Sequence, residues 1–127
     1  MPDEAELSSV CPTIGEVGIG RVVAAFYRQV PGDDVLGPMY PPQELAAAEA
    51  RLRDFLIFRF GGADRYIQQR GHPRLRQRHA PFALSQEARD HWVALMDRAL
   101  EEAELPPNIA AIMREFLHQT ATFLINS

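Results

Sequence analysis

The chain has 127 residues, which is the size of a single domain. Its 46% hydrophobic and 24% charged residues exclude a mainly disordered or fibrous protein, and its net charge of −4 argues against a general nucleic-acid binder. The single cysteine, Cys11, excludes a disulfide within the chain and fits a reducing compartment. No run of about 18 consecutive apolar residues occurs, so we predict no membrane span. The acidic start lacks the apolar core of a secretory signal. We therefore expect a cytoplasmic protein that has neither nucleic acid nor a membrane as its partner.

The N-terminal residues are expected to add little to the fold. Residues 1–14 are acidic and then small and polar, so we predict a loose or weakly helical lead-in before a single domain over 15–127. Between residues 15 and 30 the apolar positions recur at gaps of three and four, which predicts an amphipathic helix. Pro31-Gly32 ends that helix.

The middle of the chain predicts one long helix between two breaks. Three prolines within 36–42 leave room for only a turn or two of helix. Over 43–60 the apolar stripe returns, and Gly61-Gly62 ends this helix in the manner of a C-cap pair. Residues 63–82 differ in kind because they carry five arginines, and they allow one short helix over about 73–80 with proline in its first turn.

The last third of the chain predicts two further long helices. Ser85 is expected to be the N-cap of a helix that ends at Pro106-Pro107. The inner face of that helix is expected to consist of Ala88, Trp92, Leu95, Met96, Ala99 and Ala103. The last helix is expected over 107–124, with an inner face of Ile109, Ile112, Met113, Phe116, Leu117, Thr120, Phe123 and Leu124. Because no strand pattern occurs, these elements predict an all-α helical sandwich.

Few side chains in this pattern are able to carry chemistry. His79 faces the same way as Leu75 on the predicted short helix. It is either a core or surface histidine without a chemical role, or a ligand. One cysteine and unpaired histidines do not fit a structural zinc site. Tyr27 and Trp92 are expected to point inward. Together with Tyr40 they either meet backbone carbonyls or converge as hydrogen-bond donors on a small ligand in a cavity.

The arginine-rich segment 65–78 allows three interpretations. It binds nucleic-acid phosphates, it is a solvated loop, or one or two of its guanidinium groups meet the carboxylates of a bound acidic ligand. The spacing of the arginines does not choose among these three.

Several short segments together resemble the group II truncated haemoglobins, whose fold is a globin-like two-over-two helical sandwich around a haem. The matching segments are Phe26-Tyr27, Leu36-Gly37-Pro38-Met39-Tyr40-Pro41, Phe55-Leu56, Phe60-Gly61-Gly62 with Tyr66, Gly71-His72-Pro73-Arg74-Leu75-Arg76-Gln77-Arg78-His79-Ala80-Pro81-Phe82, Trp92 and Asn126-Ser127. The likeness covers about residues 20–127, and 71–82 is its most specific part. Where the family has two adjacent glycines near its start, this chain has Ile14-Gly15-Glu16-Val17-Gly18-Ile19-Gly20, so we expect a shortened or bent first helix.

The resemblance implies a site for haem b. It implies that His79 is the iron ligand, with its Nδ1–H bonded to a backbone carbonyl of the same short helix. It implies that Tyr27, Tyr40 and Trp92 form the distal polar group around a bound gas. It also implies haem contacts from Ala48, Arg51, Leu52, Phe55, Tyr66, Leu75, Arg78 and Phe82, among which the two arginines meet the propionates and Ala48 stands where longer globins place a distal histidine.

This resemblance implies a haem protein that binds O2, NO and CO. Hydrogen bonds from the distal group are expected to slow the release of O2. We therefore expect redox chemistry, either NO dioxygenation or a peroxidase-like reaction, rather than bulk oxygen transport, with an unknown reductase as electron donor. The alternative function is a haem-free helical module that binds an anionic partner through residues 65–78. Neither enzymatic turnover nor the oligomeric state is predicted by the sequence.

Overall fold

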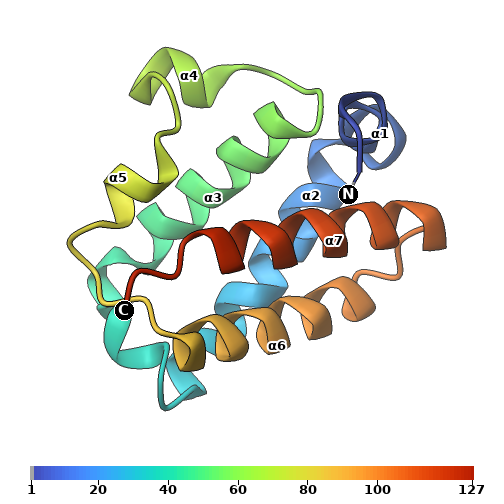
Figure 1. The fold of residues 1–127 in the computed structure, drawn as a ribbon. Helices are drawn as coiled ribbons and strands as arrows, with labels where there is room; N and C mark the ends of the chain where they lie inside the picture. Colours follow the sequence, from blue (N-terminus) through green and yellow to red (C-terminus); the bar gives the residue numbers. More distant parts are fainter. Residues whose placement is uncertain (1) are drawn as a thin grey trace.

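The computed structural model describes residues 2–127 and is dominated by four long helices (Figure 1). These are α2 (Val10–Gln29), α3 (Leu45–Arg59), α6 (Gln86–Glu102) and α7 (Pro107–Phe123). Helix α2 packs against both α3 and α6, and α6 packs against α7. The result is the predicted two-over-two helical sandwich, and no β-strand occurs among the described residues.

Short helices connect and cover the four long ones. Three are α-helical: α1 (Glu4–Ser8), α4 (Arg65–Arg70) and α5 (Leu75–His79). Three are single 3₁₀ turns: η1 (Val30–Gly32), η2 (Gly37–Met39) and η3 (Pro42–Glu44). The two turns η2 and η3 agree with the limited helix expected in the proline-rich segment. The arginine-rich segment holds two helices rather than the one expected, because Gly71, at φ 76°, separates α4 from α5.

The N-terminal residues form helix and pack against the core, where the composition predicted a loose or weakly helical lead-in. Asp3 and Glu6 form a capping box in which each side chain accepts a hydrogen bond from the backbone N–H of the other residue, and this starts α1. Leu7 and Val10 are buried in the main core, so tertiary packing stabilises a segment that has little apolar periodicity. The expected bend of the first long helix lies at Gly15, whose φ of 73° and ψ of 171° interrupt α2.

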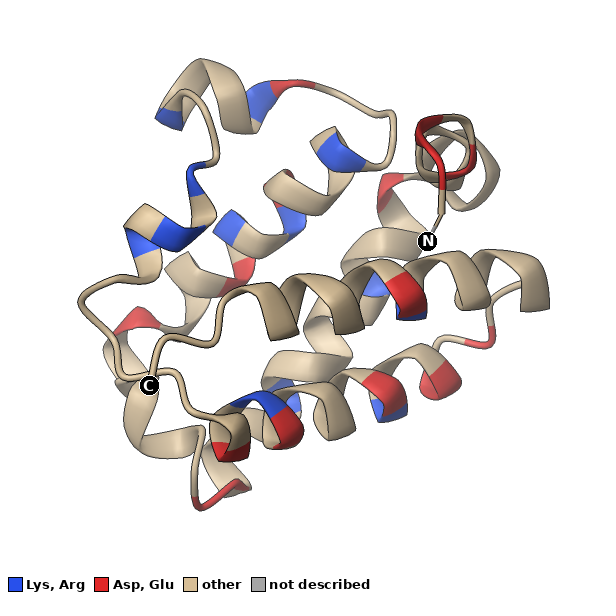
Figure 2. Cartoon of the chain, viewed as in Figure 1, with Lys and Arg blue, Asp and Glu red and all other residues tan. Residues whose placement is uncertain are grey.

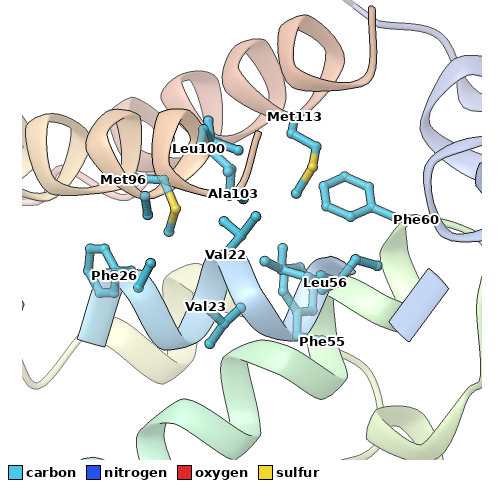
Figure 3. Close-up of a cluster of buried hydrophobic side chains, with 14 of the residues drawn as sticks. Val22, Val23, Phe26, Phe55, Leu56, Phe60, Met96, Leu100, Ala103 and Met113 are labelled. Carbon is cyan, nitrogen blue, oxygen red and sulfur yellow. The ribbon is translucent and has the colours of Figure 1, made fainter. Parts of the chain in front are cut away.

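The core lies where α2 crosses the other long helices. Figure 3 shows side chains of α2, α3, α6 and α7 meeting in one cluster. Val22, Phe26, Leu56, Phe60, Met96 and Met113 are fully buried there. Ser85 caps α6 as expected, since its hydroxyl accepts the N–H of Ala88. The prediction was wrong for one residue of the inner face of the last helix. Phe123 is 56% exposed, because the end of α7 extends beyond the core.

Helix α2 and the turn η1 together form the one stretch among residues 2–127 that is long and apolar enough to cross a membrane. This stretch, Val10–Gly32, reaches a mean hydropathy of 1.2 over its most apolar part, half of which is buried. Its apolar face contacts α3 and α6, so its composition is that of the central core helix.

Candidate functional site

The structure brings all twelve candidate residues to one cavity of about 790 Å³. They are Tyr27, Tyr40, Ala48, Arg51, Leu52, Phe55, Tyr66, Leu75, Arg78, His79, Phe82 and Trp92. The cavity lies among the end of α2, α3, α4, α5, α6 and the second half of α7. The candidate residues come from α2, the loop before α3, α3, α4, α5 with the turn after it, and α6, so segments far apart in the sequence converge.

His79 ends the short helix α5 and lies in the cavity wall. Its Nδ1 lies 2.7 Å from the carbonyl oxygen of Leu75, one helical turn earlier. A carbonyl oxygen can only accept, so Nδ1 carries the proton and donates it. In the neutral ring, Nε2 then carries the lone pair and is the ring atom available to a metal.

Tyr27, Tyr40 and Trp92 form a second polar group at the cavity. The ring centroids of Tyr27 and Tyr40 lie 5.7 Å apart in an edge-to-face arrangement, while Phe26 supports Tyr27 at 5.0 Å and Trp92 at 5.2 Å. Burial raises the pKa of the Tyr40 hydroxyl, and hydrogen bonds from Trp92 and Tyr27 only partly oppose this. Burial also raises the pKa of Tyr27. Both phenols therefore stay protonated and can donate at neutral pH.

The arginines at the cavity differ from one another in what they touch. Arg78 Nε donates to the Pro73 carbonyl at 2.8 Å, and its Nη2 donates to the Arg70 carbonyl at 2.6 Å. Most of the donors of Arg78 are therefore engaged with the backbone of its own segment. Arg51 is exposed at the cavity, and its positive charge partly opposes the rise in the pKa values of Tyr27 and Tyr40.

Arg70 is a cavity residue that the sequence did not single out. It is exposed, and its guanidinium lies 5.9 Å from the ring centroid of Tyr66. Its only sequence signal was membership of the arginine run. The arginines of residues 65–78 also do not form one uniform basic surface, because Arg65 pairs with Glu16 at 2.7 Å. Figure 2 shows blue segments along α4 and α5, with further basic residues on α3, while acidic residues occur on α1 and, among basic ones, on α6.

Other lining residues were also missed as site residues. Helix α7 and the chain after it contribute Phe116, Leu117, Thr120, Ala121, Leu124 and Ile125. Sequence periodicity assigned several of these to a helix face but could not distinguish a face against the core from one that borders a cavity. The loop before α3 adds Leu36, Pro38, Met39 and Pro41.

The remaining three histidines lie elsewhere and have local partners. His91 bonds to both carboxylate oxygens of Asp33 at 3.0 Å, and His118 bonds to Asp97 at 2.8 Å. His72 accepts the backbone N–H of a nearby residue, as a turn residue does. His79 is thus the one histidine at the cavity.

The residues present fit a haem. The cavity is within the volume range of about 300–1,000 Å³ that is usual for ligand pockets, and its lining is mostly apolar. No group of three or more His, Cys, Asp or Glu side chains suited to a bare metal ion occurs among the described residues. A single histidine suffices when a porphyrin supplies the other nitrogen ligands. Arg51 and Arg70 provide positive charge at the same cavity for carboxylates.

Comparisons with known proteins agree with this geometry. Residues 13–126 match the family described as bacterial-like globin. A group 2 truncated haemoglobin of Bacillus subtilis is 32% identical over 113 residues, covering 89% of this chain and 85% of that protein. The crystal structure of a haemoglobin from Chloroflexus aurantiacus has a TM-score of 0.89 at 36% identity, covering 93% of this chain and 98% of the other.

A third match is a solved structure described as a truncated oxygen-avid haemoglobin from Bacillus subtilis. Its TM-score is 0.87 at 31% identity, and the match covers 92% of this chain and 98% of the other. The family match, the sequence identities and the fold similarity therefore agree with the cavity and its histidine in indicating a globin. The chain belongs to the bacterial-like globin family and is a group II truncated haemoglobin, a haem protein for diatomic ligands such as O2.

Proposed function

We propose that this chain holds haem b through His79, retains O2 by hydrogen bonds from Tyr27, Tyr40 and Trp92, and uses it in redox chemistry rather than for bulk transport. The observation that carries the proposal is the cavity itself, which has one histidine with a free Nε2 in its wall and three aromatic donors grouped elsewhere in its lining. The reaction is NO dioxygenation or a peroxidase-like step, supplied with electrons by a reductase.

Haem, when bound, supplies an iron centre that coordinates diatomic gases and exchanges electrons. His79 offers Nε2 to it, and the Leu75 carbonyl fixes both the tautomer and the ring orientation. Leu52, Phe55 and Phe82 contribute apolar walls that exclude water from the ring system. Arg51, exposed at the cavity, would meet a propionate, whereas Arg78 contributes mainly by holding the segment before α5.

Retention of O2 depends on donors supplied by this chain. Dioxygen in a globin site carries partial negative charge, and a hydrogen bond to a charged group contributes about 1.5–3 kcal/mol. One such bond slows escape by roughly ten- to a hundredfold, at about 1.4 kcal/mol per decade. Ala48 is buried and carries no donor, so this role falls to the tyrosines and the tryptophan.

Slow release favours reaction over transport. A carrier must unload its gas, whereas a protein that retains O2 holds it for a second reactant such as nitric oxide or a peroxide. The description of the similar Bacillus subtilis protein as oxygen-avid supports the same direction for this chain.

The central test is His79→Ala, with His118→Ala as the matched control outside the cavity. We expect the His79→Ala protein to lose haem, or to regain ligation only when imidazole is added, while the control keeps a wild-type Soret band. A five-coordinate ferrous spectrum of wild-type form in unaided His79→Ala contradicts the assignment. Stopped-flow mixing of the oxygenated protein with nitric oxide then tests the chemistry: we expect nitrate in proportion to protein, and its absence excludes NO dioxygenation.

A further inference from the structure

Helix α5, which carries His79, has little packing of its own. Among the described residues it makes no extensive contact with any other helix. Within its own segment, Arg78, the residue before His79, donates to the carbonyls of Arg70 and Pro73. Toward the rest of the fold, Arg76 lies over the Phe123 ring and Leu75 packs against the core, but neither of these two contacts involves the backbone at the end where His79 lies.

Asn126, in the tail after α7, holds that end. Its Oδ1 accepts the backbone N–H of Leu84 at 2.8 Å. Its Nδ2 donates to the carbonyl of Phe82 at 3.0 Å and lies 3.4 Å from the carbonyl of His79 itself. One carboxamide thus uses its acceptor and its donors on the turn that joins α5 to α6.

The backbone strengthens the same junction. The N–H groups of Asn126 and Ser127 donate to the Leu84 carbonyl at 2.9 Å and 3.2 Å, and the N–H of Phe82 donates to the His79 carbonyl at 3.0 Å. The residues just before Asn126 line the haem cavity. The tail therefore closes the cavity wall beside His79.

We propose that Asn126 is a positioning residue for His79: by locking the 79–84 turn to the tail, it sets where the imidazole stands in the cavity. The Leu75 carbonyl orients the ring relative to α5, whereas contacts with other parts of the fold place α5 itself. Ring contacts from Arg76 to Phe123 and from Arg78 to Tyr66 are two of these. Asn126 adds hydrogen bonds at the His79 end, to the carbonyl of His79 and to the turn that follows. The proposal rests on His79 being the haem ligand.

Two variants separate the bonds of Asn126. Asn126→Leu removes all the side-chain bonds, whereas Asn126→Asp keeps an acceptor for the Leu84 N–H and replaces the donor by an oxygen that faces two carbonyls. Asn108→Leu is the matched control, because Asn108 is an exposed asparagine at the other end of α7.

The first measurement is amide hydrogen exchange at Leu84 in the purified full-length protein. We expect exchange to be roughly five- to tenfold faster in Asn126→Leu, as the loss of one ordinary hydrogen bond gives, and nearly unchanged in Asn126→Asp and Asn108→Leu. Unchanged exchange in Asn126→Leu overturns the proposal whether or not haem is bound.

The second measurement is specific to His79. In the ferrous holoprotein, the iron–imidazole stretching band in resonance Raman spectra is expected to shift or broaden in both Asn126 variants. Haem transfer to excess apomyoglobin is expected to be several-fold faster in both, with Asn108→Leu unchanged. If the band stays in place in both variants, Asn126 only fastens the tail to the turn, and its positioning role for His79 is overturned.

The proposed function and the role of Asn126 can be contradicted separately. A wild-type protein with no Soret band after haem supplementation contradicts the proposed function, and the exchange rate of Leu84 then still decides whether Asn126 holds the turn. A normal Soret band together with an unmoved Raman band in both variants contradicts only the inference about Asn126.

Discussion

Tyr40 is the point at which the distal side chains meet. Trp92 and Tyr27 both interact with its hydroxyl, and Arg51 adds a weaker electrostatic effect. The donors are therefore partly satisfied by one another before any gas enters. The hydrogen bonds from Trp92 and Tyr27 hold the Tyr40 hydroxyl in place, and its own O–H is left to donate to a ligand.

For Trp92→Phe we expect O2 dissociation to become roughly ten- to a hundredfold faster, since one donor is lost while most of the volume against Phe26 is kept. Tyr27→Phe is expected to act in the same direction. The double variant is expected to be non-additive, because both side chains act through Tyr40.

Stopped-flow rates for two gases check this prediction. Carbon monoxide accepts hydrogen bonds weakly, so its dissociation serves as the internal control and is expected to change much less. An unchanged O2 off-rate in Trp92→Phe makes Trp92 a packing residue and leaves retention to the two tyrosines.

At the scale of elements, α6 is tied to the turn before Tyr40 by one ion pair. Asp33 accepts the N–H groups of Val35 and Leu36 and also bonds to His91 on α6. This turn leads into η2 and Tyr40, so its stability bears on the distal side of the cavity. The pair is partly exposed and therefore contributes modestly.

We expect His91→Gln to lower the melting temperature more near pH 5.5 than near pH 8.5. The hydrogen bond to Asp33 raises the pKa of His91 above its ordinary 6.5, so the stabilisation is complete below that value and is lost as pH rises through the raised pKa. Glu87 and Asp34 raise this pKa further.

The Asp33 carboxylate sets the lower limit of the pH range in which its pair with His91 stabilises the protein. Burial by itself raises the pKa of Asp33, but the N–H of Leu36 and the ring of His91 outweigh it and leave the pKa lowered. Its contribution is present above the ordinary 3.8 and is lost as pH falls through the lowered value. Thermal melts at several pH values in an Asp33→Asn background are the control. If the His91→Gln effect keeps its pH dependence there, another group is responsible.

The junction of α1 with α3 depends on a glycine. Gly61 has a φ of 91°, and a Cβ placed on it meets the backbone carbonyl of Ser8. Next to it, the N–H of Cys11 bonds to the carbonyl of Phe60 at 2.9 Å. The N-terminal helices thus dock on the end of α3 through close backbone contact.

For Gly61→Ala we expect a loss of about 2–4 kcal/mol in the free energy of unfolding, from left-handed strain combined with overpacking. Gly32→Ala is the matched control, because its Cβ meets nothing within 4 Å and its φ is not in the left-handed region. There we expect a change of at most about 1 kcal/mol. Denaturant unfolding of both variants measures the difference, and equal values contradict this account of the junction.

The whole molecule has two unequal parts. One is a dry core where α2 meets α6 and the inner side of α3. The other is the part of the cavity wall formed by α4, α5 and the tail, in which Phe82 is half exposed. Haem held in the cavity, as proposed above, would add apolar contacts where the chain supplies few.

Removal of haem is therefore expected to loosen the protein unevenly. At a haem concentration about a thousandfold above its dissociation constant, binding contributes about 4 kcal/mol to stability. We expect hydrogen exchange in the apoprotein to rise most within 65–84 and least in α2 and α6. Thermal melts and hydrogen exchange of the two forms test this. A uniform rise across all helices contradicts the division into two parts.

Local chemistry in the sequence determined the long helices and the key histidine. Apolar residues at helical spacing, the Ser85 cap and the Gly61-Gly62 stop act through neighbours in the chain, so they can be interpreted without a fold. The motif around His79 identified the cavity residues through resemblance to a family. All twelve line one cavity, while their individual roles stay predictions.

Tertiary contacts decided what the sequence could not. The packing of Leu7, the engagement of Arg78 with carbonyls and the place of Arg70 at the cavity all depend on segments that meet only after folding. Spacing gives the direction of a side chain relative to its own helix but not the partner opposite it. For the same reason, Phe123 had the periodicity of a core residue and lies exposed, while Asn126, with no pattern of its own, holds the turn after His79.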